Sequence, residues 1–413
     1  MKLNLHYENI MKKNWLTLNT DTFLWLKGDL GLVYNATNKR RIFFALTDGI
    51  EAICHKLLIT ENLYTIELTD DSINDKGVNK WVQSLIDIDA GYLTYNVTYE
   101  TRPISLKPIL KVQDKKEYYE FKHSQGFRGE ILQNIHEITF YINGSVYGNN
   151  AYFKQHVFPL KDCLVLDSSK IQSFINNSIN PVISNINLVG NLFSYSGFEI
   201  MVESISNLSI PCTIHIMIQD FLDNIRKIKE INWPNQTQFN VLVDTAFDVS
   251  CIQGITIPFS ITAFVFSEKD FHNFSTMFEV FPAGQSVRFI PLYNKKNLPF
   301  FESNIFIEKD ELDTIELSKN EIFMRQALNS RDFGKLTIMP DEKVYANVNT
   351  PFLGTINDSP YSIVYKEFMN GQSWLKVRNQ SPCNDCIYQW LCPSPSNYET
   401  IIGRSNLCHI NRV

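Results

Sequence analysis

The apolar residues between positions 20 and 90 follow two different spacings. Short apolar and aromatic runs on either side of a Lys27-Gly28-Asp29 turn predict a β-hairpin followed by a third strand; the expected strands are Thr22–Leu26, Gly31–Asn35 and Arg41–Ala45. Farther on, apolar side chains recur every three or four residues in two stretches that begin at Ile50 and Val78, which is the spacing of one helix face. Residues 1–100 are therefore expected to form a small α+β domain.

The centre of the chain divides into a linker and a long repeating segment. Residues 101–130, with two prolines, two glycines and the mixed-charge run Lys111–Glu120, are expected to be a linker. From 131 to 320, short β-branched strands alternate with helix-length segments; the expected strands are 136–142, 186–189, 213–218, 239–243, 261–266 and 286–290, with helices over 220–231 and 268–279. This alternation predicts an α/β fold with a parallel sheet, arranged as an open, partial (β/α)6 barrel.

The last segment, residues 321–413, loses the helical repeat. A hairpin is expected over Leu336–Tyr345, turning at Pro340-Asp341, and an extended stretch over Phe352–Ile356. A short helix is expected over Ser362–Phe368, and a cysteine-rich region follows it. The segment is expected to be a separate C-terminal domain.

Composition and charge narrow the functional classes. The chain has 413 residues, which is enough for two or three domains, and its net charge of −6 argues against a nucleic-acid-binding protein. Met1–Leu16 lacks an apolar core of signal-peptide length, and no apolar run reaches the roughly 20 residues of a membrane span. We therefore expect a cytoplasmic protein with no membrane partner, in a compartment where clustered cysteines bind metal rather than form disulfides.

Four of the eight cysteines are concentrated near the C-terminus. Cys383, Cys386, Cys392 and Cys408 follow the pattern Cys-x2-Cys-x5-Cys-x15-Cys, whereas the others are scattered singly at positions 54, 163, 212 and 251. A Cys-x2-Cys loop presents two thiolates to one metal centre, and two further thiolates complete four-coordination of zinc or of an iron–sulfur cluster. On spacing alone zinc is at least as well supported. His409 is an alternative zinc ligand, although we expect Cys408 to bind.

The order of the three predicted domains and the amino-acid sequence of residues 383–399 resemble those of SPASM-type radical SAM peptide maturases. That resemblance implies one auxiliary [4Fe–4S] cluster held by Cys383, Cys386, Cys392 and Cys408, and it favours iron–sulfur over zinc. The family usually has a further cysteine where this chain has Ser396, and the region 344–354 also lacks cysteine. The resemblance therefore implies that one auxiliary cluster is kept and a second is lost.

The catalytic motif of that family is missing. Three cysteines of a Cys-x3-Cys-x2-Cys motif would follow the first barrel strand, but Gly144, Gly148 and Ala151 stand in those positions, before Tyr152. Gly190-Asn191-Leu192 replaces the Gly-Gly-Glu motif that would hold the methionine amine. Binding and cleavage of S-adenosylmethionine are therefore not expected. In this respect the chain resembles the pseudo-radical-SAM proteins of Bacteroidales-type systems that mature ribosomally synthesised peptides.

The N-terminal hairpin and helices form a winged-helix-like module that resembles PqqD-like leader-recognition domains. Such domains capture a leader peptide as an added strand on a sheet edge. Ile42 and Phe44 in the third strand, with Trp81 and Leu85 in the second helix, are the candidate peptide contacts. From this segment alone, a structural domain without a ligand is the better-supported interpretation.

These features lead to one main hypothesis and two alternatives. The main hypothesis is a non-catalytic protein that binds a precursor or leader peptide and a catalytic radical SAM maturase in a heteromeric complex. One alternative is an enzyme with different chemistry in the barrel, where Asp244 ends the fourth strand. The other is an electron-transfer subunit that uses the auxiliary cluster. His215 and Arg288, both in strands, are expected to line the barrel, and a helix N-cap is the simpler role for Asp244.

Overall fold

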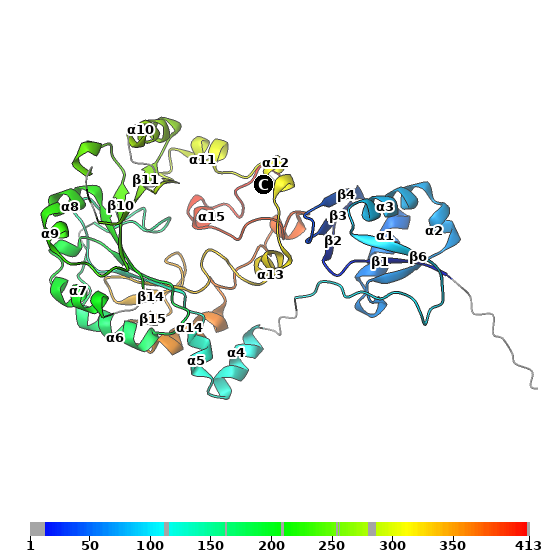
Figure 1. The fold of residues 1–413 in the computed structure, drawn as a ribbon, viewed down its shortest axis with the longest axis horizontal. Helices are drawn as coiled ribbons and strands as arrows, with labels where there is room; N and C mark the ends of the chain where they lie inside the picture. The colour runs from blue at the N-terminus through cyan, green and yellow to red at the C-terminus, as the bar shows by residue number, and fades with distance from the viewer. Residues whose placement is uncertain are drawn as a thin grey trace, which may run out of the picture.

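The computed structural model describes residues 13–110, 115–161, 163–207, 210–252, 255, 257–279 and 286–410. A small N-terminal α+β part lies beside a larger α/β part (Figure 1). Most of Met1–Leu16, where we looked for a signal peptide, and part of the charged run 111–120 lie outside the described residues.

The three predicted N-terminal strands are confirmed. They form an antiparallel sheet in the order β2-β3-β4, with bounds Thr22–Lys27, Leu30–Asn35 and Arg41–Ala45. Gly28 lies in the β2–β3 turn with a φ of 57°, a left-handed conformation that glycine adopts without steric cost. The two predicted helices are also present, as α1 (Asp48–Leu58) and α3 (Lys76–Asp87).

A second N-terminal sheet was not expected from the sequence. β1 (Lys13–Leu18) is its central strand and pairs antiparallel with β5 (Thr65–Leu68) and β6 (Gly91–Val97). The short helix α2 (Asp70–Asn74) and the 3-10 turn η1 (Thr60–Asn62) connect these elements. Residues from both sheets and from α1 and α3 share one buried apolar core.

The segment expected as a linker contains two helices. They are α4 (Lys115–Ser124) and α5 (Arg128–Leu132). Both contact α14 (Pro360–Asn370), and the ring of Tyr119 stacks on that of Phe368 with centroids 3.5 Å apart. This part of the linker is therefore attached to the C-terminal region of the chain.

All six predicted strands of the central segment form one parallel sheet. The observed bounds are β7 Glu137–Tyr141, β8 Asn185–Val189, β9 Cys212–Met217, β10 Thr237–Val243, β11 Phe259–Val265 and β12 Val287–Pro291. The full sheet has nine strands in the order β12-β11-β10-β9-β8-β7-β13-β14-β15. β13 (Lys335–Ile338) extends the parallel part beside β7, and β14 (Lys343–Tyr345) and β15 (Gly354–Thr355) follow antiparallel.

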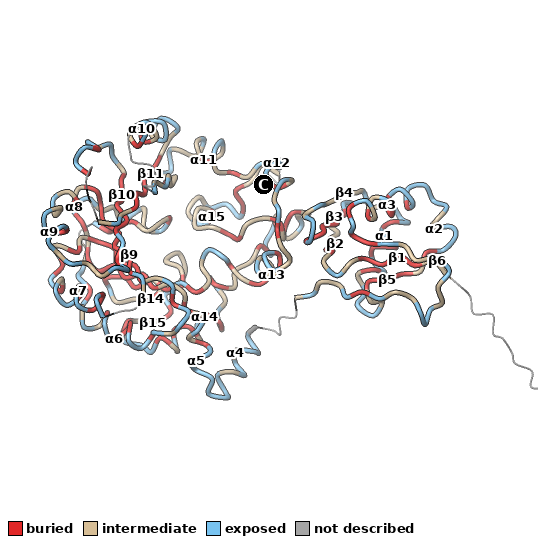
Figure 2. Tube along the Cα trace, viewed as in Figure 1, coloured by how far each residue is buried: buried red, intermediate tan, exposed pale blue. Residues whose placement is uncertain are grey.

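Helices cover one face of this sheet, whereas the C-terminal segment lies on the other side (Figure 1). The covering helices are α6 Ser168–Ser178, α7 Phe198–Ser206, α8 Ile218–Asp223, α9 Ile225–Glu230 and α10 Glu268–Phe278. The helix predicted over 220–231 is thus two helices that meet at Asn224, whose Nδ2 donates to Asp220 O at 2.8 Å. Figure 2 shows that the buried residues follow the strands of the sheet.

The remaining elements are four helices after β12 and three 3-10 turns. The helices are α11 Leu298–Asn304, α12 Lys309–Thr314, α13 Lys319–Ala327 and α15 Asn397–Ile402, and the 3-10 turns are η2 Leu192–Ser194, η3 Val249–Ile252 and η4 Cys383–Asp385. The predicted hairpin over 336–345 is confirmed as β13–β14, and the predicted helix over 362–368 lies within α14. Among the described residues, the chain has no helix of the length and apolarity that crossing a bilayer requires.

Candidate functional site

Three of the four clustered cysteines lie on one tightly wound loop. Cys383 begins the η4 turn, and Cys386 N donates to Cys383 O at 3.2 Å. The winding continues as Gln389 N donates to Cys386 O at 3.0 Å and Cys392 N donates to Tyr388 O at 2.9 Å. Successive turns of this kind bring residues spaced by three and six positions to the same side of the loop.

Cys408 reaches the same place through a separate contact. It forms a parallel bridge with Ile307, in which Ile307 N donates to Leu407 O at 2.9 Å and His409 N donates to Ile307 O at 3.1 Å. The four predicted cysteines consequently line one small cavity. His409, the alternative ligand, lines a different, polar hollow, and its Nε2 lies 2.8 Å from Glu302 O.

A buried arginine, which the sequence analysis did not single out, lies beside these thiols. Arg378 Nη1 donates to Cys383 Sγ at 3.6 Å, and Nη2 donates to Glu399 Oε1 at 2.7 Å, with both ion-pair side chains below 10% exposure. Its Nε also donates to Pro393 O. The only signal in the sequence is its position, five residues before Cys383.

Burial and the neighbouring positive charge shift the pKa values of the thiols in opposite directions. Burial raises the pKa of Cys383 and raises that of Cys392 to about 12, while the positive charge of Arg378 lowers both. Cys383 and Cys408 also raise the pKa of Cys392, so three of the thiols interact electrostatically. Because a metal centre binds thiolates, its binding here would release protons.

The donor set is that of a structural zinc site or of a [4Fe–4S] cluster. Among the described residues, no group of three or more histidine, cysteine or acidic side chains is arranged to hold one metal ion. Four thiolates on one zinc would lie about 3.8 Å apart, given a tetrahedral site with 2.3 Å bonds. A [4Fe–4S] cluster is held by thiolates on four separate irons, which are more widely spaced. Four thiols around one cavity, with a guanidinium beside them, supply the donors that either group needs.

The loop after β7 is crowded at Gly148, one of the three positions where the family resemblance places a cysteine. A Cβ atom built on Gly148 would lie 2.2 Å from Leu160 O and 2.8 Å from Pro159 O, both backbone atoms. Gly148 N donates to Ser145 O at 2.9 Å, so the glycine is held against that backbone. A cysteine cannot occupy position 148 without a shift of the main chain. Gly144 is half-buried in the same loop, and Ala151 is exposed.

A buried carboxylate holds this loop in place. Asp220 accepts hydrogen bonds from Ser145 Oγ and, at 2.8 Å, from Asn191 Nδ2. Burial raises the pKa of Asp220, although both hydrogen bonds favour its ionised form. Asn143 Nδ2 donates to Asn191 O at 2.9 Å, which ties the ends of β7 and β8 together. The loop is therefore held by hydrogen bonds among Asn143, Ser145, Asn191 and Asp220.

A chain of four hydrogen bonds crosses five strands, β11 to β7, on the face opposite the helices. Thr262 Oγ1 donates to Asn240 Oδ1 at 2.9 Å, which leaves Asn240 Nδ2 as the donor to His215 Nδ1 at 3.0 Å. The proton of His215 is then on Nε2, which donates to Asn187 Oδ1 at 2.9 Å. Asn187 Nδ2 finally donates to Glu137 Oε1, also at 2.9 Å. In all four bonds, the acceptor is the partner nearer to the Glu137 carboxylate along the chain of hydrogen bonds.

The histidine in this chain of hydrogen bonds is neutral. His215 is only 7% exposed, and burial, followed by the charges of His156 and Arg288, lowers its pKa to about 3. The prediction that His215 lines the barrel interior agrees with this position, in which both ring nitrogens are used. Burial also raises the pKa of Asp244, whose charge acts on Tyr152.

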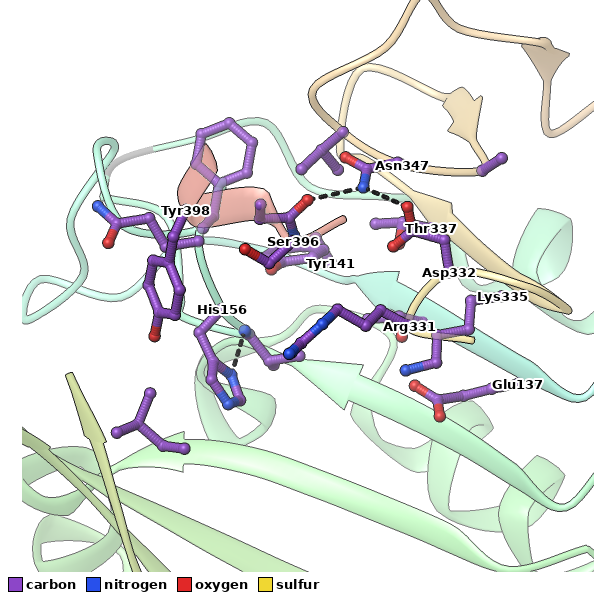
Figure 3. A pocket seen from close by; sticks show the side chains of 18 of the residues that line it. Glu137, Tyr141, His156, Arg331, Asp332, Lys335, Thr337, Asn347, Ser396 and Tyr398 are labelled. Carbon is purple, nitrogen blue, oxygen red and sulfur yellow. Dashed lines mark hydrogen bonds between the residues drawn. The ribbon is translucent and has the colours of Figure 1, made fainter. Parts of the chain in front are cut away.

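Glu137 lies on the wall of a pocket of about 440 Å³ (Figure 3). The wall is built from β7, β12 and β13, from the segment 153–157, and from the start of α15. Its charged members are Glu137, Arg331, Asp332 and Lys335, and its polar members include His156 and Asn347. The sequence analysis missed this pocket because its lining residues extend from position 137 to position 398.

The four predicted peptide contacts do not share one surface. Trp81 and Leu85 are buried in the core of the N-terminal part, while Ile42 and Phe44 on β4 are half-buried. The rings of Phe44 and Trp81 lie 5.4 Å apart. β4 pairs only with β3, so its other side is a sheet edge. Trp81 and Leu85 thus belong to the core against which β4 packs, and Ile42 and Phe44 are the more accessible pair.

The β2–β3–β4 sheet lies directly against the cysteine-rich segment. The ring of Phe43 is 5.3 Å from that of Tyr388, whose hydroxyl donates to Asp313 Oδ1 at 2.7 Å. Arg41 Nη1 donates to Leu312 O at 2.9 Å, and Lys27 Nζ donates to Asn384 O. A shared apolar cluster joins the two parts; it includes Phe23, Leu32, Tyr34, Leu312, Leu317, Tyr388 and Leu391. Nothing in the sequence indicated this contact.

Comparison with known proteins gives only distant structural neighbours. No family model and no curated protein matches the chain. The crystal structure of Streptococcus suis SuiB bound to its precursor peptide SuiA has a TM-score of 0.43, 12% identity, and coverage of 95% of this chain and 97% of that one. For SuiB bound to S-adenosylmethionine the TM-score is 0.42 and the identity 11%, with 94% of this chain and 97% of that one covered. For anSMEcpe with bound AdoMet the TM-score is 0.39 and the identity 13%, with 66% of this chain and 100% of that one covered. Similarity at this level assigns no activity.

Proposed function

We propose that this chain is a non-catalytic, pseudo-radical-SAM partner in the maturation of a ribosomally synthesised peptide. The supporting observation is a contrast between two sites in one molecule. Four cysteines line one cavity at the C-terminus, whereas the loop after β7, where the catalytic ligands would lie, has backbone atoms 2.2 Å from a Cβ at Gly148. In this proposal the central sheet is a degenerate partial barrel, and residues 321–413 are a SPASM-like domain.

The metal centre in this proposal is one auxiliary [4Fe–4S] cluster bound by Cys383, Cys386, Cys392 and Cys408. When bound, it would contribute folding free energy on the order of 10 kcal/mol to the C-terminal segment, as metal centres do in other small motifs. The chain's own residues hold the ligand loop: Arg378 fixes Pro393 and Cys383, and Tyr388 fixes α12. The cluster is thus a structural element.

The N-terminal part, a PqqD-like winged-helix domain in this proposal, would bind the leader of the precursor peptide along β4. A strand added to a sheet edge gains main-chain hydrogen bonds and places alternate side chains in pockets. β4 has an edge, and its half-buried Ile42 and Phe44 lie over Trp81. A leader in this position would also pass close to Phe43 and therefore to Tyr388 of the cysteine loop.

The proposed complex is cytoplasmic and contains this chain, the peptide and a catalytic radical SAM maturase. It is tested by co-expressing the affinity-tagged chain with a candidate maturase and precursor peptide, and measuring co-purification and leader affinity by fluorescence anisotropy. We expect binding of both partners and no cleavage of S-adenosylmethionine by this chain alone. Absence of binding to either partner would reject the proposal, and turnover of the peptide by the isolated chain would favour an enzyme with other chemistry.

One observation favours electron transfer as a second function of the same cluster. Cys408 lines both the cysteine cavity and the polar hollow of about 610 Å³ formed by residues such as Glu302, Arg404 and His409. A cluster bound there would have one ligand at the surface of the protein, where a redox partner could approach. Reduction of the cluster by the partner maturase's electron donor would support this function.

A further inference from the structure

The pocket has two exposed cationic side chains, Arg331 and Lys335, that form no ion pair with a described residue, although Lys335 acts electrostatically on Asp332. Arg331 Nε donates to Ser394 O at 3.3 Å, and in the described part of the chain no acceptor is found for its Nη groups. Lys335 Nζ likewise has no carboxylate within ion-pair distance among the described residues, although Lys335 lies opposite Glu137 in the β13–β7 register. Figure 3 shows Arg331 extending across the pocket towards His156.

His156 presents a third donor. Its Nδ1 accepts a hydrogen bond from Val157 N at 2.7 Å, so the ring proton of the neutral form is on Nε2. Burial, followed by the charges of Arg288 and Lys335, lowers the pKa of His156 to about 4. At neutral pH the ring is an uncharged N–H donor.

The two acidic residues of the pocket are engaged by donors of the protein itself. Asp332 Oδ2 accepts from Asn347 Nδ2 at 2.9 Å, from Ser373 Oγ at 3.1 Å and from Asn329 Nδ2 at 3.2 Å. Glu137 Oε1 accepts from Asn187 at the end of the hydrogen-bond chain. Each carboxylate therefore accepts these hydrogen bonds through one of its two oxygens, whereas the Nη groups of Arg331 have no acceptor among the described residues.

The rest of the pocket wall is mixed. Its apolar and aromatic side chains are those of Tyr141, Phe153, Val157, Ile290, Pro291, Ala346, Val348 and Tyr398, and its uncharged polar ones are those of Thr139, Gln155, Thr337, Ser396 and Asn397. The volume of about 440 Å³ lies in the range of small-molecule sites, about 300–1,000 Å³. Arginine binds carboxylates through paired N–H donors, and such charge-assisted bonds are the stronger class of hydrogen bond.

We propose that this pocket binds a compact organic acid, with its carboxylate between Arg331, Lys335 and His156 and its apolar body against Tyr398 and Phe153. The site is separate from the four cysteines and from β4, so it adds a ligand to this chain whether or not the proposed maturation function holds.

The test is isothermal titration of the full-length chain with phenylacetate, with neutral phenylacetamide as the shape-matched control. We expect saturable binding of phenylacetate with a Kd of about 1 mM or tighter, and binding of phenylacetamide at least about tenfold weaker. Arg331→Gln and Lys335→Gln should each weaken phenylacetate binding about tenfold, while Arg331→Lys should restore part of the affinity. Lys229→Gln, on the exposed face of α9, is the control and should bind as the parent does.

Four outcomes would overturn the proposal. They are equal affinity for phenylacetate and phenylacetamide, unchanged affinity in Arg331→Gln, no binding of phenylacetate up to about 10 mM, and inorganic phosphate binding as tightly as phenylacetate. The melting temperature of each variant, measured in parallel, shows that a loss of affinity does not come from unfolding. The result is independent of the maturase, because neither partner is present in the titration.

Discussion

The hydroxyl of Tyr34 closes a reciprocal pair of hydrogen bonds with the backbone of Leu317. It donates to Leu317 O at 2.8 Å and accepts from Leu317 N at 2.7 Å, and both residues are buried. One side chain of the N-terminal sheet thereby satisfies both polar groups of a residue 283 positions away. This pair fixes how the N-terminal part lies on the cysteine-rich segment.

Tyr34→Phe should therefore destabilise the protein by about 1–3 kcal/mol, because it leaves the buried Leu317 N without its acceptor, while Lys39 Nζ still donates to Leu317 O at 2.9 Å. Urea denaturation followed by fluorescence measures the change. Tyr95→Phe is the matched control, since Tyr95 is 59% exposed and its loss should alter stability by less than about 0.5 kcal/mol. Equal effects of the two substitutions would show that the interface does not depend on this pair.

Metal content tests the cysteine cavity directly. After anaerobic purification we expect about four iron and four sulfide per chain, as one [4Fe–4S] cluster requires. Cys386→Ser should reduce the iron content strongly, whereas Cys251→Ser, at an exposed and remote position, should leave it unchanged. About one zinc per chain in place of iron would contradict the cluster and leave only the four-thiolate site.

Replacing Gly148 should lower the stability of the protein even when the new side chain is a single methyl group. A Cβ there meets backbone atoms of Pro159 and Leu160, so Gly148→Ala should destabilise the protein by about 1–3 kcal/mol, the usual cost of overpacking. Gly129→Ala is the control: it lies in α5 with nothing within 4 Å of the added Cβ, and alanine favours helix. Thermal unfolding of the two variants should shift in opposite directions, and a parallel shift would mean that the 159–160 backbone yields easily.

His215 should make stability dependent on pH. Its folded-state pKa, about 3, lies below the ordinary value of 6.5, so the folded state binds fewer protons and loses stability as pH falls below about 6.5. Between pH 7 and pH 5 the loss from this group is about 2 kcal/mol. In His215→Gln, denaturation curves at the two pH values should differ by about 2 kcal/mol less than in the parent. An unchanged difference would place the protonation elsewhere.

The ion pair between Arg378 and Glu399 should matter more than a surface pair. Arg378→Met leaves the Glu399 carboxylate buried without its partner, and breaking a buried pair in this way costs about 3–5 kcal/mol. Arg404→Met removes the exposed pair with Glu302 and should cost at most about 1 kcal/mol. Urea denaturation of the two variants provides the comparison, and similar costs would mean that Glu399 finds other donors.

The sequence predicted the strands well where they are apolar and locally bounded. β7 to β11 were expected because each is an apolar-rich run buried on both faces, which leaves a nearly continuous apolar signal. β12, at the edge of the sheet, has no buried residue and was expected from its short apolar run alone. β1, β5 and β6 were missed; β1 pairs with partners about 50 and 80 positions away, and such pairing leaves no local pattern. The α4 helix was missed because its charged surface looks like a solvated linker.

The candidate sites show the same division. The four cysteines could be found because their spacing is itself the signal, and the structure brings them to one cavity. Arg378, Tyr388 and the pocket around Arg331 could not be found, because their roles depend on contacts between segments far apart in the chain. The peptide contacts are a mixed result, since helical spacing cannot tell whether Trp81 faces a ligand or a core.

The crowding at Gly148 has an evolutionary consequence. On the proposed descent from a catalytic ancestor, a single reversion to cysteine at this position would strain the main chain at Pro159–Leu160 before it could contribute a ligand. Two further ligands would still be missing at Gly144 and Ala151. On this proposal, selection would oppose the first substitution towards a catalytic cluster, so the loss of the cluster would be difficult to reverse by single substitutions.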